Sequence, residues 1–345
     1  MDILLLVVSF LVILFGAELF TNGIEWFGRK LNLSEGAIGS VLAAVGTALP
    51  ETMIPFIAIV VGGGVAGGEV GIGAILGAPF MLATLAMFVT GAAALLMRKR
   101  RATGELLSVS SDVLGHDMSY FAVAYAIAIG VALLPVDLEW PRRLTAVVLL
   151  GIYAMHVMGH LRAEAAEHHE LEPLRFHKLD RRAPQHPEPP RLPIVSLQVL
   201  AALACIVGGA WGFVRAVEDL SAAAGLNPTL MALVIAPIAT ELPEKLNSVL
   251  WVRRGKDTLA MGNITGAMIF QSAIPTSIAL IFAPSLWSVS GAGIAFLSAG
   301  IAFASSAAIF VPMVLRKRLS ARPLLVGGAF YLAYLTVVIV TLARG

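Results

Sequence analysis

The chain has 345 residues, of which 58% are hydrophobic and only 13% are charged, against roughly 25% charged in an ordinary soluble domain. This composition excludes a water-soluble enzyme, because a soluble protein of this size must cover its surface with polar groups. The small net charge of +2 excludes a nucleic-acid-binding protein. The single cysteine, Cys205, excludes disulfide bridges and thiolate metal clusters.

Apolar stretches of about twenty residues predict helices that cross the bilayer, because that length spans its hydrocarbon core. No Lys or Arg precedes the N-terminal run, which we therefore interpret as the first span rather than a signal peptide. Ten spans are predicted: 3–24, 36–61, 70–96, 117–134, 142–161, 193–214, 227–252, 258–282, 286–314 and 323–343. The sequence thus predicts an all-α polytopic membrane protein.

The polar segment 162–192 divides the predicted spans into two halves of five. We expect residues 1–161 and 193–345 to be membrane domains joined by a solvated His/Pro-rich linker. Lys and Arg in short loops predict a cytoplasmic linker, both termini outside, and a multi-pass protein of the plasma (inner) membrane. The few bases that do not fall on the cytoplasmic side are Arg142, Arg143, Arg215, Arg344 and, inside a span, Lys245.

Residues 34–51 align without a gap on residues 227–244, and the two segments share the pattern Thr-x-Leu-Pro-Glu. Because each half has an odd number of spans, the second copy must enter the membrane upside down relative to the first. Inverted repeats of this kind place matched residues near the midplane of secondary transporters. We therefore predict two inverted five-helix repeats.

Each copy of the pattern places a glutamate deep inside a predicted span, where an ionisable residue indicates a functional site. Thr47 precedes Glu51 by four residues and Thr240 precedes Glu244 by four, so hydroxyl and carboxylate share a helix face. Carboxylate and hydroxyl oxygens are ligands that hard cations prefer. These four residues are the predicted core of a cation site.

In both copies proline leaves the backbone carbonyl one turn earlier without a hydrogen-bond donor, because proline has no backbone N–H. That carbonyl oxygen is a further possible ligand. Pro50 cannot donate to the carbonyl of Gly46, and Pro243 cannot donate to the carbonyl of Ala239. Both carbonyls are therefore candidate ligands, and both prolines are candidate structural or gating residues. Irregular backbone at this depth is tolerated where it lines a cavity.

GTALPE and ATELPE resemble the paired GTSLPE signatures of the calcium/cation antiporter superfamily, the sodium/calcium exchangers. The likeness covers nearly the whole chain outside the linker and indicates a divergent prokaryotic-type member. It implies that Glu51 and Glu244 bind the transported cation, that Thr47 and Thr240 contribute oxygens, and that the first and sixth helices slide past a fixed core.

The flanking segments GAILGAPF and GNITGAMIF resemble the GNxxGSN helices of that family but lack several of its oxygen ligands. Ala78 and Leu82 stand in the first copy, and Ala267 and Gln271 in the second, where the family has Ser and then Asn or Asp. Gln271 alone can still offer an oxygen.

A charged pair, Glu241 and Lys245, replaces the neutral Ala48 and Thr52 of the first copy. The spacing is the favourable one for a Glu-to-Lys pair on a helix, so mutual compensation is the favoured interpretation. The alternative is that Glu241 is a further cation ligand or that Lys245 occupies the place of a coupling ion.

Glu18, in the segment GAELFTNG, is interpreted as a structural or gating residue of the first helix. The residues just before the fourth span, Asp112, His116 and Asp117, are given a helix-capping role. Most of the histidines fall in or beside the linker, and we favour an incidental, solvated cluster there over a pH or metal sensor. These are His156, His160, His168, His169, His177 and His186.

The sequence therefore predicts a secondary-active cation antiporter, most simply one that exchanges Ca²⁺ for Na⁺ or H⁺ by alternating access. No enzymatic activity and no cofactor are expected; the partners are inorganic cations and the lipid bilayer. A Na⁺- or H⁺-coupled antiporter for a cation other than Ca²⁺ is one alternative. A membrane ion sensor or channel regulated by the His-rich linker is another.

Overall fold

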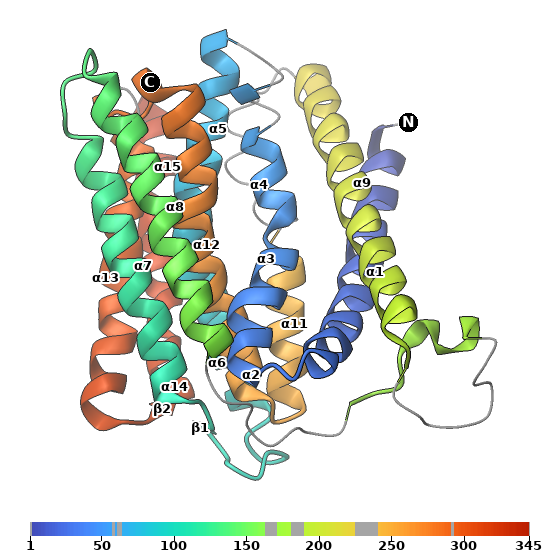
Figure 1. The fold of residues 1–345 in the computed structure, drawn as a ribbon. Helices are drawn as coiled ribbons and strands as arrows, with labels where there is room; N and C mark the ends of the chain where they lie inside the picture. The colour runs from blue at the N-terminus through green and yellow to red at the C-terminus, as the bar shows by residue number, and fades with distance from the viewer. Residues whose placement is uncertain are drawn as a thin grey trace.

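The computed structural model describes residues 2–56, 59–60, 64–162, 171–180, 190–224, 241–290 and 293–344 (Figure 1). Within these residues, eight helices are long and apolar enough to cross a membrane. They agree with the first, the third to sixth, and the eighth to tenth predicted spans. The all-α polytopic fold is thereby confirmed, while the number ten stays a prediction.

The first half begins with a single long helix followed by a broken one. Asn32, in the left-handed region at φ 54°, ends the first helix. The predicted span 36–61 is interrupted, with a π-helical stretch where its first turns lie and a break after residue 47. The elements are α1 (Asp2–Lys30), α2 (Glu35–Ala37), the π-helix η1 (Ile38–Ala43), α3 (Ala44–Thr47) and α4 (Leu49–Phe56).

Three further spans complete the described part of the first half. The fourth span starts six residues earlier than predicted, because the Ser110 side chain accepts a hydrogen bond from the N–H of Val113 and caps the helix there. The cap is therefore Ser110, not the acidic residues that follow it. The elements are α5 (Gly64–Met81), η3 (Leu82–Ala86), α6 (Met87–Leu96), β1 (Leu106–Leu107), α7 (Ser111–Val131) and α8 (Glu139–Arg162).

The second half repeats the alternation of long and short helices. Gly255 at φ 75° makes the tight turn between two of its helices, a conformation that L side chains rarely adopt. The elements are η4 (Arg175–Leu179), α9 (Leu192–Ala224), α11 (Leu242–Arg253), α12 (Asp257–Phe282), η5 (Pro284–Leu286), α13 (Gly293–Arg316), β2 (Leu319–Ser320), α14 (Ala321–Leu324) and α15 (Val326–Arg344).

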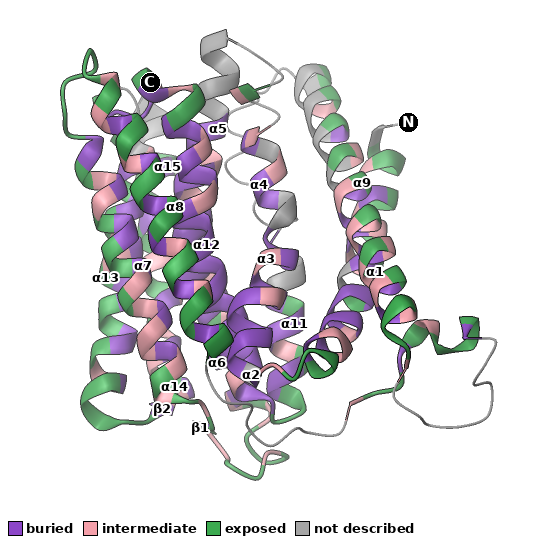
Figure 2. Ribbon diagram, in the orientation of Figure 1, coloured by how far each residue is buried: buried purple, intermediate pink, exposed green. Residues whose placement is uncertain are grey.

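The helices form a main bundle around α12, with α1 and α9 packed against each other at one side (Figure 1). Buried residues gather along α12, while the outward faces of α8 and α13 are exposed and rich in Leu and Val (Figure 2). In water such faces would aggregate, whereas lipid solvates them. α12 is therefore the buried centre of the bundle, and α1 and α9 pack chiefly against each other at its side.

Both termini lie at one end of the bundle, and residues 171–180 lie at the other, which we call the linker face (Figure 1). Strands β1 and β2 pair there in antiparallel register. Buried ion pairs also fasten this face: Arg101 to Asp257 at 2.6 Å and Lys256 to Glu25 at 2.7 Å. The paired strands and the buried ion pairs therefore hold the segments of the linker face together.

Candidate cation-binding site

The first copy of the motif lies at a break in the helix that crosses the bundle. Helix α3 ends at Thr47, Ala48 has φ −84° and ψ 3°, and α4 begins at Leu49. The side chains of Thr47 and Glu51 are both buried, the latter with 7% exposed. A hydroxyl and a carboxylate therefore stand one turn apart on either side of the break, as the spacing predicts.

The backbone at Gly46 is in close contact with α1. A Cβ atom built on Gly46 would lie 1.8 Å from Cζ of Phe20, whose ring is buried. Glycine is required here because the aromatic ring occupies the space of a side chain. The Gly46 carbonyl stands one turn before the Pro50 nitrogen, which has no hydrogen to donate to it.

The two copies of the motif share their local backbone where both are described. Glu241, which aligns with Ala48, has φ −87° and ψ 1°, nearly the same dihedrals. The N–H of Lys245 donates to the Glu241 carbonyl at 3.2 Å, and the N–H of Thr52 donates to the Ala48 carbonyl at 3.2 Å. The aligned sequences thus adopt the same turn, in a backbone region that active-site residues often occupy.

Part of the predicted site lies outside the described residues. This applies to Ala239 and Thr240 entirely, and to the side chains of Pro50, Pro243 and Glu244. The meeting of the two motif copies across the bundle therefore stays a prediction.

Glu241 and Lys245 form an ion pair, with 3.1 Å between Oε2 and Nζ. Both side chains are buried, so the two charges compensate each other away from solvent. This geometry is what the four-residue spacing predicts; whether either group takes part in transport stays open to experiment.

Helix α12 contributes polar groups that face the first motif. The Thr47 hydroxyl donates to Oδ1 of Asn263 at 3.2 Å and lies 3.0 Å from the Ala43 carbonyl. Asn263 is fully buried, as is the side chain of Gln271 two turns further on. Asn263 was not among the predicted site residues, although its place in the GNITG segment is a usable signal.

The sequence matches the family model described as "Sodium/calcium exchanger protein" over residues 1–161 and 195–342. The chain belongs to this family. A curated relative in Alkalimonas amylolytica, "Putative antiporter CaxA", is 25% identical over 286 residues, which are 83% of this chain and 82% of the relative.

Solved structures of the sodium-calcium exchanger NCX_Mj share the fold. The structure soaked with 2.5 mM Na⁺ and 0.1 mM Sr²⁺ has a TM-score of 0.70 at 18% identity and covers 97% of this chain and 99% of its own. The structure soaked with 10 mM Na⁺ and zero Ca²⁺ has a TM-score of 0.69 at 17% identity, covering 97% and 98%. These structures show that the fold is shared, and the family-model match confirms the membership that the paired motif indicates.

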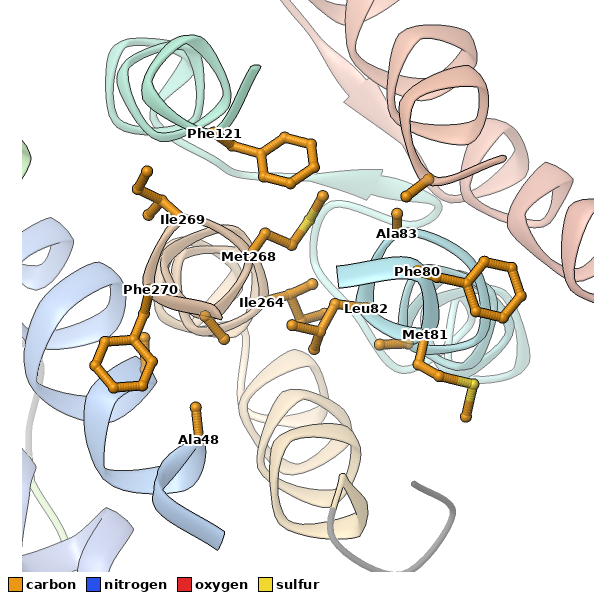
Figure 3. Packing of buried hydrophobic residues seen from close by; sticks show 14 of the residues in the cluster. Ala48, Phe80, Met81, Leu82, Ala83, Phe121, Ile264, Met268, Ile269 and Phe270 are labelled. Atoms are coloured by element: carbon orange, nitrogen blue, oxygen red, sulfur yellow. The ribbon is translucent and has the colours of Figure 1, made fainter. Parts of the chain in front are cut away.

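Ala78 of α5 and Leu82 of η3 are apolar, although the exchanger pattern has oxygen-bearing side chains at both positions. Leu82 lies beside Ile264 of α12, at the position where the pattern has Asn or Asp, and both belong to the buried core (Figure 3). Ala78 on α5 and Ala267 on α12 are also buried without an oxygen to offer. All three positions are therefore apolar and buried in this chain.

A cavity of about 390 Å³ opens between α1, α11 and the linker at the linker face. Glu18 lines it and accepts a hydrogen bond from Arg175 at 3.0 Å, which agrees with a structural or gating role. The linker is not solvated throughout: the Trp26 indole donates to the Glu172 carbonyl, and Gln198 accepts from the Phe176 N–H. Residues 171–180 are thus docked on α1 and α9.

The interpretation of the histidines needs correction. His156 and His160 lie inside α8 and are buried, so they belong to the bundle and not to the linker. They pack against His116 of α7. Asp117, assigned a capping role, is instead fully buried beside them. His177 lies in η4; the other linker histidines, His168, His169 and His186, fall outside the described residues.

Proposed function

We propose that this protein is a secondary-active cation antiporter that exchanges Ca²⁺ for Na⁺ or H⁺ by alternating access. The observation that carries the proposal is the buried carboxylate of Glu51 at a helix break inside an apolar bundle. A carboxylate at that depth costs several kcal/mol and is retained where it binds a cation or proton. The names of the matched relatives, exchangers and an antiporter, support the same conclusion.

The proposed site combines Glu51 and Glu244 with the hydroxyls of Thr47 and Thr240. The carbonyls of Gly46 and Ala239 and the amide oxygen of Gln271 are further ligands. The shared turn geometry at Ala48 and Glu241 supports a two-fold arrangement of these groups. A hard cation would exchange its water shell for this set of oxygens.

Movement of α1 and α9 relative to the main bundle would switch access to the site. These two helices pack chiefly against each other, and Phe20 of α1 covers Gly46 beside the motif. The docked residues 171–180 and the Arg175–Glu18 contact tie the pair to the linker. We place the linker face in the cytoplasm of a plasma (inner) membrane protein, because the loops there hold most of the Lys and Arg.

A second candidate is an antiporter with the same architecture that moves a cation other than Ca²⁺. Leu82, Ala78 and Ala267 favour it, because each removes an oxygen from the exchanger pattern. Fewer ligands imply fewer cation positions, and therefore fewer ions in each transport cycle. Such a site would fit coupling to protons or to fewer sodium ions.

Ion flux in proteoliposomes tests both candidates. Calcium uptake is measured under an imposed sodium gradient and then under a pH gradient, with Glu51→Gln as the site variant and Glu139→Gln as its matched control. Glu139 is a half-exposed glutamate at the other end of the bundle. We expect Glu51→Gln to reduce exchange at least tenfold and Glu139→Gln to leave it unchanged.

Equal flux in Glu51→Gln and the unmodified protein would refute the assignment of the site. Movement of another cation, with no calcium flux under any gradient, would select the second candidate. Flux without stoichiometric counter-movement would indicate a channel, and binding without flux would indicate a sensor.

A further inference from the structure

Three histidines meet between α7 and α8 near the linker face, on a different part of the bundle from the proposed transport motif. Ligand nitrogens of His116, His156 and His160 all lie within 4.8 Å of one another. Their ring centroids are 5.4, 4.8 and 4.8 Å apart, so each imidazole contacts the other two. Three neutral donors of one kind, converging inside a membrane protein, form a potential metal site.

His156 is the member of this cluster whose burial is not explained by hydrogen bonds of its ring nitrogens. Its side chain is fully buried, yet neither ring nitrogen has a hydrogen-bond partner among the described residues. Oδ1 of Asp117 lies 3.8 Å from its Nδ1, which is too long for a hydrogen bond. Burying an imidazole without a hydrogen-bond partner is unfavourable unless the ring serves as a ligand.

Asp117 orients the cluster in the way that a carboxylate orients a metal-bound histidine. Its Oδ1 lies 2.6 Å from Nε2 of His160, a contact of the kind that fixes the orientation of a metal-binding ring. Its Oδ2 accepts hydrogen bonds from the hydroxyls of Ser40 at 2.7 Å and Thr265 at 2.5 Å. Both oxygens are therefore engaged, and Asp117 supports the ligands rather than joining them.

Two features of the fold bring these three rings together. His156 and His160 are four residues apart and share one face of α8. Gly159 lets α7 approach that face, because a Cβ atom there would lie 2.7 Å from Cε1 of His116. Two rings from one helix and one from its neighbour are thereby held at close range.

We propose that His116, His156 and His160 bind a single Zn²⁺ ion, with Asp117 as the positioning residue. Zn²⁺ takes imidazole nitrogens at about 2.0–2.1 Å, which requires nitrogen–nitrogen separations of roughly 3.4 Å. The nitrogens lie within 4.8 Å of one another, so the side chains would have to rotate towards a bound ion. Three nitrogens suit Zn²⁺ or a similar transition-metal ion and are poor ligands for Ca²⁺, which prefers oxygen.

The site stands at a junction of the elements that carry the transport motif. Ser40 belongs to η1, seven residues before Thr47, and Thr265 belongs to α12, two residues after Asn263. Gly266 allows the backbone of Ser40 to touch α12, since a Cβ atom there would lie 2.1 Å from the Ser40 carbonyl oxygen. A bound ion would hold α7 and α8 together and, through Asp117, η1 and α12.

The test is Zn²⁺ binding to the full-length protein in detergent after chelator treatment, measured by competition with a chromophoric chelator. We expect one Zn²⁺ per chain and a nitrogen-dominated shell near 2.0 Å in X-ray absorption. His116→Ala, at the most exposed of the three positions, should weaken binding at least 100-fold. Asp117→Asn should weaken it about 10–100-fold without removing a ligand.

Two controls separate this site from others. His177→Ala removes a histidine of the linker, and Glu51→Gln alters the transport motif; both should bind Zn²⁺ like the unmodified protein. Gly159→Ala keeps every ligand but displaces His116, so it should weaken binding about tenfold even if other variants fold poorly. Substoichiometric binding, unchanged affinity in His116→Ala, or loss of binding in His177→Ala or Glu51→Gln would each overturn the proposal.

Discussion

The buried pair Glu241–Lys245 offers a sharp quantitative test, because the first copy of the motif provides its neutral equivalent. Ala48 and Thr52 occupy the matched positions and form the same turn. Changing Glu241→Ala and Lys245→Thr together converts the second turn into the first. Each single change leaves one buried charge without its partner.

The magnitude follows from the 3.1 Å separation of Nζ and Oε2. At an effective dielectric constant of about 20, the attraction is roughly 5 kcal/mol, and the cost of removing both charges from water offsets most of it. Removing one partner should therefore destabilise the protein by about 3–5 kcal/mol, whereas removing both should cost less than about 2 kcal/mol. The expected coupling free energy is several kcal/mol.

The assay is the free energy of unfolding in mixed detergent micelles for the four proteins of this double-mutant cycle. The matched control is the cycle on Glu139 and Arg143, a pair with the same spacing and a 2.9 Å contact but with half-exposed side chains. That pair should couple by no more than about 0.5 kcal/mol. Additive losses at Glu241 and Lys245, with coupling equally small, would refute mutual compensation.

Two further predictions concern packing. Gly46→Ala should reduce exchange at least tenfold, because the added Cβ atom would lie 1.8 Å from Cζ of Phe20. The control Gly151→Ala should leave exchange unchanged, because its Cβ atom would meet nothing within 4 Å. Equal ion flux in the two variants would contradict the argument. Arg142→Met should lower the melting temperature much more than Arg143→Met does. Arg142 is fully buried and its guanidinium donates hydrogen bonds to backbone carbonyls, each worth about 1.5–3 kcal/mol. Similar melting curves for the two variants would contradict this prediction.

Properties that depend on neighbouring residues could be predicted from the sequence. Continuous apolar runs determine which segments span the membrane, because a helix satisfies its own backbone groups without help from elsewhere. The break at Thr47 and the spacing of Glu241 and Lys245 are likewise local, since Pro50 removes a donor and residues four apart share a helix face. The family resemblance rests on the same short motifs.

Contacts between segments that are far apart in the sequence could not be predicted in this way. From the sequence alone, residues 171–180 are a polar linker. Their docking depends on their own backbone groups, which form hydrogen bonds with the side chains of Trp26 and Gln198. Leu82 could be recognised as a lost ligand, but its packing against Ile264 appears only in the assembled bundle (Figure 3). Side-chain character alone does not specify these partners.

Low charge content and the paired motif thus determined a membrane protein of the exchanger family, while the placement of Glu51 and Glu244 inside spans stays a prediction. Only the tertiary structure shows that His116, His156 and His160 lie together. His116 lies 40 residues before His156 in the sequence, and the packing of α7 against α8 across Gly159 brings their rings together. The four-residue spacing of His156 and His160 is visible in the sequence, but nothing in the sequence links that pair to His116 on another helix.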